Sequence, residues 1–212
     1  VPGIGPRTAV RLAQDLKVTN IEELERALLD GKVAAMPQMG QKSAENILKH
    51  LQSLRRKDTR IPIGQALAVV DSILEQMKAF PGVYDIVPAG RLRRFRETIG
   101  DIDIMATARD PEPVARAFSS LPQVTEVLVQ GASKTSVLVE GGLQVDLRIV
   151  EPESFGAMLQ YFTGSKEHNI LLRERGGRMG LKLSEYGITV LETEALEKYR
   201  DEAAFYARLG LP

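Results

Sequence analysis

Residues 100–104 read Gly100-Asp101-Ile102-Asp103-Ile104. In a β-strand, side chains two residues apart point to the same face, so Asp101 and Asp103 project together while the isoleucines face a core. Two neighbouring carboxylates repel each other, and a hard divalent cation such as Mg²⁺ is their usual compensation. The run therefore predicts a strand with a candidate metal site on its polar face.

A third acid of the same kind is Asp146, in the run Gln144-Val145-Asp146-Leu147-Arg148. Residues 140–142, Glu-Gly-Gly, form a hairpin-type turn, which predicts that the strands on either side of it pair antiparallel. Three acids on adjacent strands can hold two metal ions about 4 Å apart, an arrangement that supports in-line phosphoryl transfer. An isolated Asp-x-Asp pair is also common on exposed strand faces, so the hypothesis needs a further feature.

That feature is the run Pro88-Ala89-Gly90-Arg91-Leu92-Arg93-Arg94, which precedes the paired acids. A glycine turn after a strand lets backbone N–H groups approach a phosphate, and arginines add positive charge around its oxygens. A glycine and arginines that lead into Gly-Asp-x-Asp on the next strand form a nucleotidyltransferase signature.

The first 54 residues contain an internal repeat. Residues 2–5, Pro-Gly-Ile-Gly, recur 35 residues later as residues 37–40, Pro-Gln-Met-Gly. The pattern indicates a helix-hairpin-helix module, whose glycine turn offers backbone amides at a helix N-terminus to a DNA phosphate without reading base sequence. The second copy has Gln38 in place of the first glycine, and we expect it to serve mainly in packing. The expected helices of this module cover residues 6–16, 21–29 and 41–54.

A polar stretch at 55–60 ends at Ile61-Pro62 and predicts a linker and a domain boundary. Beyond it, helical and strand patterns alternate. Residues 176 and 177 are both glycine and are expected to interrupt the helix before them. The expected helices cover 64–80, 109–120, 155–162, 166–175 and 194–209, and the expected strands cover 84–87, 99–106, 124–130, 136–140, 143–150 and 187–191.

These elements predict an α+β fold. An N-terminal all-α helix-hairpin-helix module at 1–60 precedes a nucleotidyltransferase palm at 61–152, which has a small mixed β-sheet flanked by helices. Residues 153–212 form a subdomain expected to contact nucleotide and template.

Charge is distributed unevenly although the net charge of the 212 residues is zero. Residues 1–60 carry a balance of +4 and residues 61–160 a balance of −4. A basic front and an acidic middle fit a phosphate-binding module joined to a cation-binding one, although chance variation would give similar numbers. The absence of cysteine excludes disulfides and thiolate metal sites, and no apolar run is long enough to span a membrane.

Taken together, the motifs resemble those of DNA polymerases of family X, in their bacterial form. The resemblance spans essentially all 212 residues, and its most specific part is the run at 161–165. The motifs that carry it are Pro-Ala-Gly-x-Leu-Arg-Arg at 88–94, Glu-Thr-x-Gly-Asp-Ile-Asp at 97–103, Val-Asp-Leu-Arg at 145–148, Tyr-Phe-Thr-Gly-Ser at 161–165 and Leu-Ser-Glu-Tyr-Gly at 183–187.

The resemblance implies functional residues. Asp101 and Asp103 would bind two Mg²⁺ or Mn²⁺ ions, and Asp146 would bind the catalytic ion and help to activate a primer 3′-hydroxyl. The implied contacts to the incoming nucleotide are Gly90, Arg91, Arg94, Gly100, Tyr161, Phe162, Gly164 and Asn169. The expected DNA contacts are Gly3, Gly5, Arg7 and Thr8 in the first module and Arg148, Lys166 and Arg173 in the rest.

Three positions depart from the family pattern. Arg91 stands where the family has a serine that contacts the triphosphate, Phe95 replaces a glycine, and Gln144 replaces an arginine found in some relatives. These departures bear on triphosphate geometry and on rate, and they leave the three aspartates intact.

The sequence is thus interpreted as the core of a template-directed DNA polymerase that fills short gaps during repair. Its expected partners are gapped or primer–template DNA and deoxynucleoside triphosphates, and we expect a monomer in the bacterial cytoplasm, associated with the nucleoid and not with a membrane. Two alternatives stay open: a template-independent nucleotidyltransferase, and a DNA-binding scaffold whose catalytic site has weakened.

Overall fold

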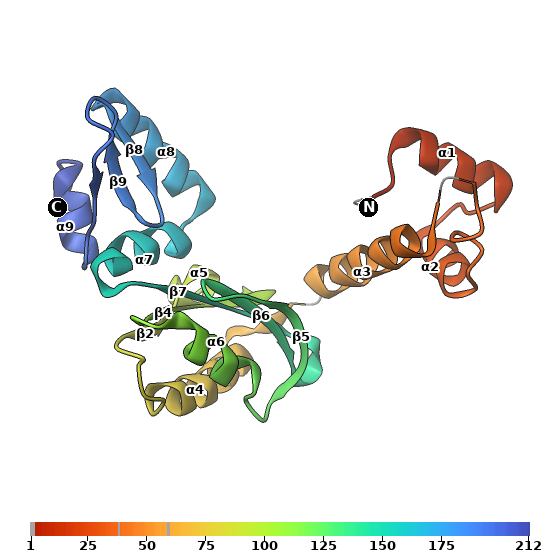
Figure 1. The fold of residues 1–212 in the computed structure, drawn as a ribbon, viewed down its shortest axis with the longest axis horizontal. Helices are drawn as coiled ribbons and strands as arrows, with labels where there is room; N and C mark the ends of the chain where they lie inside the picture. Colours follow the sequence, from red (N-terminus) through yellow and green to blue (C-terminus); the bar gives the residue numbers. More distant parts are fainter. Residues whose placement is uncertain (1–2, 38, 59) are drawn as a thin grey trace. The chain divides into compact units, whose positions relative to one another are not determined.

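The chain folds into two compact units, Val1–Thr59 and Arg60–Pro212, each with a hydrophobic core of its own. The computed structural model describes residues 3–37, 39–58 and 60–212, and Figure 1 shows their fold. The predictions made for Pro2 and Gln38 lie outside the described residues.

The described part of the first unit is helical, as expected. Asn20 caps the second helix by accepting a hydrogen bond from the Glu23 amide at 2.8 Å. Gly3 has a positive φ of 88° and lies against Ile47, so the glycine turn packs on the core of this unit. The third helix continues to Asp58, beyond the expected end at residue 54, so part of the predicted linker is helical. The helices are α1 (Pro6–Asp15), α2 (Ile21–Leu29) and α3 (Gln41–Asp58).

The second unit is built on a five-stranded mixed sheet of order β2-β4-β7-β6-β5. Strands β4 and β7 pair in parallel, and the other neighbours pair antiparallel, including β6 and β7 on either side of the predicted turn. The strands are β2 (Ile86–Pro88), β4 (Asp101–Thr107), β5 (Val124–Gln130), β6 (Lys134–Val139) and β7 (Gln144–Val150).

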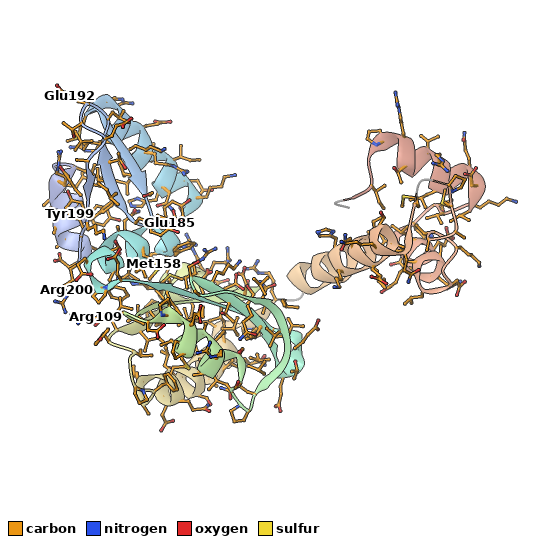
Figure 2. All side chains as sticks on the ribbon, viewed as in Figure 1. Arg109, Met158, Glu185, Glu192, Tyr199 and Arg200 are labelled. Carbon is orange, nitrogen blue, oxygen red and sulfur yellow. The ribbon has the colours of Figure 1, made fainter. Side chains whose placement is uncertain are left out.

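Alternation along the strands decides what each face of this sheet buries. Ile102 and Ile104 face helices α4 (Ile63–Lys78) and α6 (Pro111–Ser119), which lie on one side of the sheet in Figure 1. Met105 faces the other side, where it packs with Met158 of helix α7 (Phe155–Thr163), which lies over the sheet in Figure 2. The acids share the α7 side, because they alternate with the isoleucines.

The C-terminal part of the second unit packs around a small antiparallel sheet of order β10-β9-β8. Its core includes Leu172, Ile188 and Phe205. The elements are α8 (Lys166–Arg178), β8 (Leu181–Ser184), β9 (Gly187–Val190), β10 (Leu196–Glu197) and α9 (Glu202–Arg208); the remaining elements of the unit are β1 (Ile61–Pro62), α5 (Gly90–Arg93), β3 (Thr98–Ile99), η1 (Glu140–Gly142) and η2 (Pro152–Ser154).

Three sequence predictions about these elements were wrong. The strand expected over 99–106 breaks at Gly100, because β3 pairs with β1 while β4 joins the large sheet. The helix expected over 194–209 begins only at Glu202, where the Asp201 carboxylate caps it by accepting from the Ala204 amide at 2.8 Å. Residues ahead of this cap form β10.

The third wrong prediction concerns Gly176 and Gly177, which were expected to interrupt their helix. Helix α8 instead continues through both glycines to Arg178. A Cβ at Gly176 would collide with Leu183, so this glycine lets β8 approach the helix closely. Strand β8 itself was missed by the sequence analysis. None of the helices within residues 3–37, 39–58 and 60–212 is long and apolar enough to cross a membrane.

Two glycines of the second unit allow a matched test of packing. A Cβ at Gly156 would collide with the backbone of Asp201, whereas a Cβ at Gly177 meets nothing within 4 Å. We expect Gly156→Ala to lower the free energy of unfolding by about 1–3 kcal/mol through overpacking, and Gly177→Ala to raise it by up to about 1 kcal/mol through helix propensity. All five tyrosines lie in the second unit, so urea titration followed by tyrosine fluorescence reports on it alone. Equal effects of the two substitutions would contradict the packing of α7 on Asp201.

Candidate active site on the acidic face of the sheet

The structure brings the three predicted aspartates together on two neighbouring strands. Asp101 and Asp103 lie on β4, and Asp146 lies on β7 directly opposite Asp103 in the parallel register. Asp101 is exposed, while Asp103 and Asp146 are partly buried. The alternation inferred from sequence thus places all three carboxyl groups on one face of the sheet.

Burial and crowding act on Asp103 in particular. Burial raises the pKa of this carboxyl to about 6, and the charges of Asp101 and Asp146 act in the same direction. Arg148 and Lys134 oppose the rise. The acids are therefore close enough to repel one another, as the sequence argument requires.

The carboxylate of Asp146 is held on both oxygens by protein donors. Gln144 Nε2 donates to one oxygen at 2.8 Å, and Lys134 Nζ forms an ion pair with the other at 3.2 Å. Only 13% of the Asp146 side chain is exposed. Gln144, one of the three departures from the family pattern, therefore orients this acid, and Lys134 is a further neighbour of the candidate site that was not predicted from sequence.

The donor set fits a hard divalent cation by its chemistry. Three carboxylates supply oxygen ligands of the kind that Mg²⁺ and Mn²⁺ bind, and a cation would lower the pKa of Asp103, which burial and then the charges of Asp101 and Asp146 raise. Among the described residues, no group of three or more acidic, histidine or cysteine side chains already converges on one ion position. This agrees with the contacts of Asp146, whose oxygens face Lys134 and Gln144.

The glycine of the arginine-rich run is packed directly against the acids. Gly90 has φ +58°, and any Cβ there would collide with the carboxylate of Asp103. The Ala89 amide donates to the Asp103 carbonyl at 2.8 Å, so the run is tied to β4 by its backbone. Residues 90–93 form one helical turn, α5, where a plain turn was expected. Only glycine satisfies both the backbone conformation and this close approach.

Arginines surround this turn at close quarters. The pKa of Arg94 is lowered by burial and by the nearby charges of Arg96 and Arg91. Its Nη1 donates to the Thr163 carbonyl, and a Cβ at Gly164 would lie 3.1 Å from that nitrogen. Concentrated positive charge beside the acids is the arrangement expected of a site that takes a phosphate group.

A second arginine joins the turn to the C-terminal part of the unit. Arg93 forms a two-point ion pair with Glu202 of α9, with distances of 2.8 and 2.6 Å, and also donates to the Thr163 hydroxyl at 2.7 Å. This pair raises the pKa of Arg93. Neither residue was predicted as a site residue, and the sequence offers no spacing that would join positions 93 and 202.

The predicted nucleotide-contacting residues of the C-terminal part cluster at the α7–α8 junction. The rings of Tyr161 and Phe162 meet edge to face with centroids 5.1 Å apart. Asn169 Nδ2 donates to the Tyr161 carbonyl at 2.7 Å, and Gln160 Nε2 donates to Asn169 Oδ1 at 2.8 Å. Gln160 was missed, because a glutamine within an apolar helix run gives no sign of its partner.

The predicted DNA contacts of the second unit differ in exposure and in the residues that they contact. Lys166 and Arg173 are exposed on α8. Arg148 instead lies over the Phe162 ring, with its guanidinium carbon 4.1 Å from the ring centroid. The remaining predicted contacts, Gly3, Gly5, Arg7 and Thr8, lie in the first unit around the start of α1.

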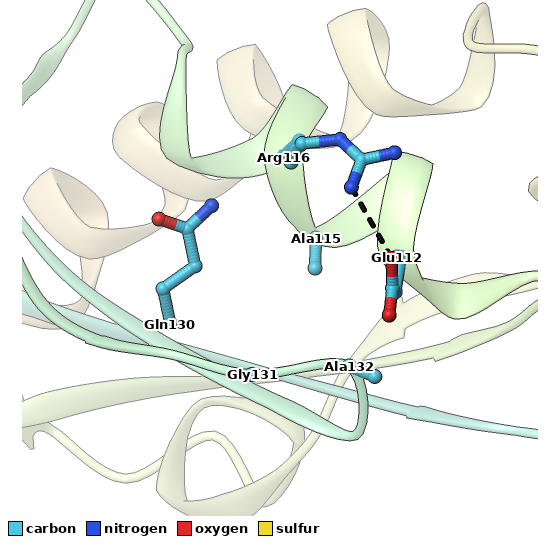
Figure 3. A pocket seen from close by; sticks show the side chains of 6 residues that line it. All are labelled: Glu112, Ala115, Arg116, Gln130, Gly131 and Ala132. Carbon is cyan, nitrogen blue, oxygen red and sulfur yellow. Dashed lines mark hydrogen bonds and ion pairs between the residues drawn. The ribbon is translucent and has the colours of Figure 1, made fainter.

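A separate hollow of about 240 Å³ lies between α6 and the β5–β6 turn (Figure 3). Its polar lining includes Glu112 and Arg116, which form an ion pair at 3.3 Å, and Gln130. None of the predicted site residues lines it.

Comparison with protein families gives two matches. The model for the DNA polymerase beta thumb matches residues 158–212, and the model for the SAM-like helix-hairpin-helix tandem matches residues 1–53. The first covers the α7–α9 region that carries Asn169, and the second covers the helical unit with the glycine turn.

Known proteins resemble the chain over its whole length. The DNA polymerase/3′-5′ exonuclease PolX of Bacillus subtilis is 36% identical over 214 residues, which cover 100% of this chain and 38% of that protein. The chain thus spans well under half the length of this curated relative.

Among solved structures, the Leishmania infantum polymerase beta ternary P/T complex matches with a TM-score of 0.75 at 20% identity, covering 100% of this chain and 92% of that one. The ternary gap complex of the same polymerase gives 0.74 at 19% identity, with coverage of 99% and 84%. These matches show that the expected α+β fold is correct.

The raised pKa of Asp103 makes a prediction for the metal-free protein. A folded pKa of about 6, above the ordinary value of 3.8, means that ionising Asp103 destabilises the fold. This cost is absent below pH 3.8, grows as the pH rises toward 6 and is constant above it. In EDTA, we expect the stability advantage of Asp103→Asn over the parent to grow across this interval by on the order of 1–3 kcal/mol. The measurement is urea titration followed by tyrosine fluorescence at pH values from about 4 to about 8.

Asp110→Asn is the matched control, because Asp110 is exposed and makes no capping hydrogen bond to α6. The same titration of this variant measures how far removal of an exposed aspartate of the same unit changes stability across the interval. An advantage of Asp103→Asn that is equally large at both ends of the pH range would exclude charge crowding at β4 and β7 as its cause.

Proposed function

We propose that the chain, which is similar to family X DNA polymerases, is the core of a template-directed polymerase that adds deoxynucleotides to a primer 3′-hydroxyl in short DNA gaps. The observation that carries the proposal is the placement of Asp103 opposite Asp146 beside the Gly90 turn. Phosphoryl transfer is catalysed mainly by positioning and by charge neutralisation, and the acids and the neighbouring arginines on this face of the sheet offer groups for both.

In this proposal Asp101, Asp103 and Asp146 hold two Mg²⁺ or Mn²⁺ ions. When bound, such ions lower the pKa of an attacking hydroxyl and neutralise charge on the triphosphate and its leaving group. To serve as a ligand, the Asp146 carboxylate must exchange its contact with Lys134 for the cation. Asp103 must stay ionised, and a cation would lower its raised pKa.

The protein's own cations would position the triphosphate. The backbone at Gly90, Arg91 and Gly100 borders the acids, and Arg94 adds a guanidinium that the Thr163 carbonyl orients. Tyr161, Phe162, Gly164 and Asn169 would contact the sugar and base. Lys166, Arg173 and Arg148 are the proposed contacts to the nascent pair and its template.

The first unit would hold the DNA backbone at the N-terminus of α1. Gly5 occupies the cap position without a side-chain hydrogen bond, and the first turn contains no acidic residue. Backbone amides at such a terminus suit a phosphate, and Gly3, Arg7 and Thr8 lie around it. We also propose that it acts in the bacterial cytoplasm, at the nucleoid, because its proposed substrate is DNA and the similar PolX protein is bacterial.

Nucleotide addition on one-nucleotide-gapped DNA tests the catalytic proposal. We expect template-matched addition in Mg²⁺ or Mn²⁺, and a fall in rate of at least about 100-fold with Asp146→Ala because a ligand and a charge are removed together. Asp110→Ala removes an exposed aspartate of the same unit and should leave the rate unchanged. Addition that ignores the template base would favour the template-independent alternative. Binding of gapped DNA without addition in either metal would favour the scaffold.

Salt dependence tests the role of the first unit. Removing one charged side chain that binds a phosphate lowers the slope of log K against log salt by about 1. We expect Arg7→Ala to lower the slope for duplex DNA by about this amount. Arg26→Ala removes a cation from α2, away from the start of α1, and should leave the slope unchanged. Equal changes for both variants would mean that net charge, and not the start of α1, governs binding.

A further inference from the structure

Gln160 is one of the few fully buried polar side chains of the described residues. It lies on α7 with 3% of its surface exposed, directly before the Tyr161–Phe162 pair. A buried amide that lacks partners is costly, so the contacts of Gln160 account for its presence.

A directional chain of hydrogen bonds starts at the backbone. The Tyr161 carbonyl can only accept, so the amide nitrogen of Asn169 must face it, and it does at 2.7 Å. The oxygen of Asn169 then faces Gln160, whose nitrogen donates at 2.8 Å. The carbonyl therefore dictates the orientation of two amide groups in succession. A leucine at position 160 would leave the oxygen of Asn169 without this donor.

Gln160 also contacts an aromatic hydroxyl, that of Tyr206. Burial and the charge of Glu202 raise the pKa of the Tyr206 hydroxyl, and a hydrogen bond with Gln160 opposes the rise. The same hydroxyl lies 2.9 Å from Nε2 of His168, the residue before Asn169 on α8. Helices α7, α8 and α9 thus meet in one polar network that leaves Gln160 little freedom to turn.

Asn169 keeps one N–H unused after these contacts, since its amide nitrogen carries two hydrogens. Both A·T and T·A pairs present hydrogen-bond acceptors at their minor-groove edge. A single N–H donor there can therefore bond to a nucleotide of either pair without discriminating between them. An amide free to flip would instead present its oxygen to those acceptors for part of the time. An Asn169 amide held in one orientation therefore presents its N–H donor, and not its oxygen, to such acceptors.

We propose that Gln160 is a positioning residue for the incoming nucleotide: it holds the Asn169 amide so that its free N–H points to an acceptor on the minor-groove edge of that nucleotide. The inference rests on the proposed function and assigns a role to a residue that touches no substrate. It predicts that Gln160 affects nucleotide affinity through Asn169 and in no other way.

The test compares Gln160→Leu, Asn169→Ala and the double variant of the 212-residue chain. On gapped DNA we expect Gln160→Leu to raise KM for the matched deoxynucleoside triphosphate about 3- to 10-fold, the effect expected for one hydrogen bond, with little change in kcat. The double variant should be no worse than Asn169→Ala alone. Gln123→Leu is the matched control, because it removes a Gln76–Gln123 hydrogen bond in the same unit and should leave KM unchanged.

Equilibrium binding of the same triphosphate to a dideoxy-terminated primer measures affinity without chemistry and should show the same pattern. Equal Kd values for the parent and Gln160→Leu, with Asn169→Ala weakened, would overturn the inference. Further weakening by Gln160→Leu in the Asn169→Ala background would overturn it too, because that effect would come from packing. Absence of nucleotide binding by the parent chain would overturn the proposed function itself, and this inference with it.

Discussion

Mutual repulsion of carboxylates on β4 and β7 is the constraint around which the second unit is arranged. Burial together with Asp101 and Asp146 raises the pKa of Asp103 to about 6, so the fold holds these carboxyl groups closer together than their charges favour. Parallel pairing of two strands in an otherwise antiparallel sheet creates this crowding, because it sets Asp103 opposite Asp146. A fold selected only for stability would not do so.

Local positive charge offsets this repulsion in two ways. Lys134 lies on the strand next to β7 and pairs with Asp146, whereas Arg148 acts on Asp103 and packs on Phe162. The arginine-rich turn is anchored elsewhere, to the Thr163 carbonyl and to Glu202. The arginine-rich turn beside the acids is thereby linked to α7 and α9, the helices that also carry Gln160 and Tyr206.

Patterns among residues that are close in sequence predicted the structure well, whereas contacts between residues far apart in sequence were not predicted. Period-two alternation placed the three acids on one face, and the Glu140–Gly142 turn was readable because the strands that it joins lie directly on either side of it. The split at Gly100 was not readable, since it depends on pairing between β3 and β1, which are far apart in sequence. Lys134 and Gln160 were missed for the same reason: their contacts with Asp146 and Asn169 come from a neighbouring strand and an adjacent helix, and no motif marks them.

The two departures from the family pattern in the arginine-rich run have physical explanations. Phe95 adopts a positive φ of 52° and is 78% exposed, so the backbone there needs the conformation that glycine adopts freely, and phenylalanine takes it at a cost of about 1–2 kcal/mol. Arg91 donates from Nε to the Thr98 carbonyl at 3.2 Å, an oxygen that Arg60 also binds at 2.8 Å. Its side chain is thus engaged on β3, while the main-chain amide of residue 91, which no side chain alters, still follows Gly90 beside the acids. Replacing serine by arginine therefore removes a hydroxyl from the turn and keeps the backbone donor on which phosphate binding at such a turn depends.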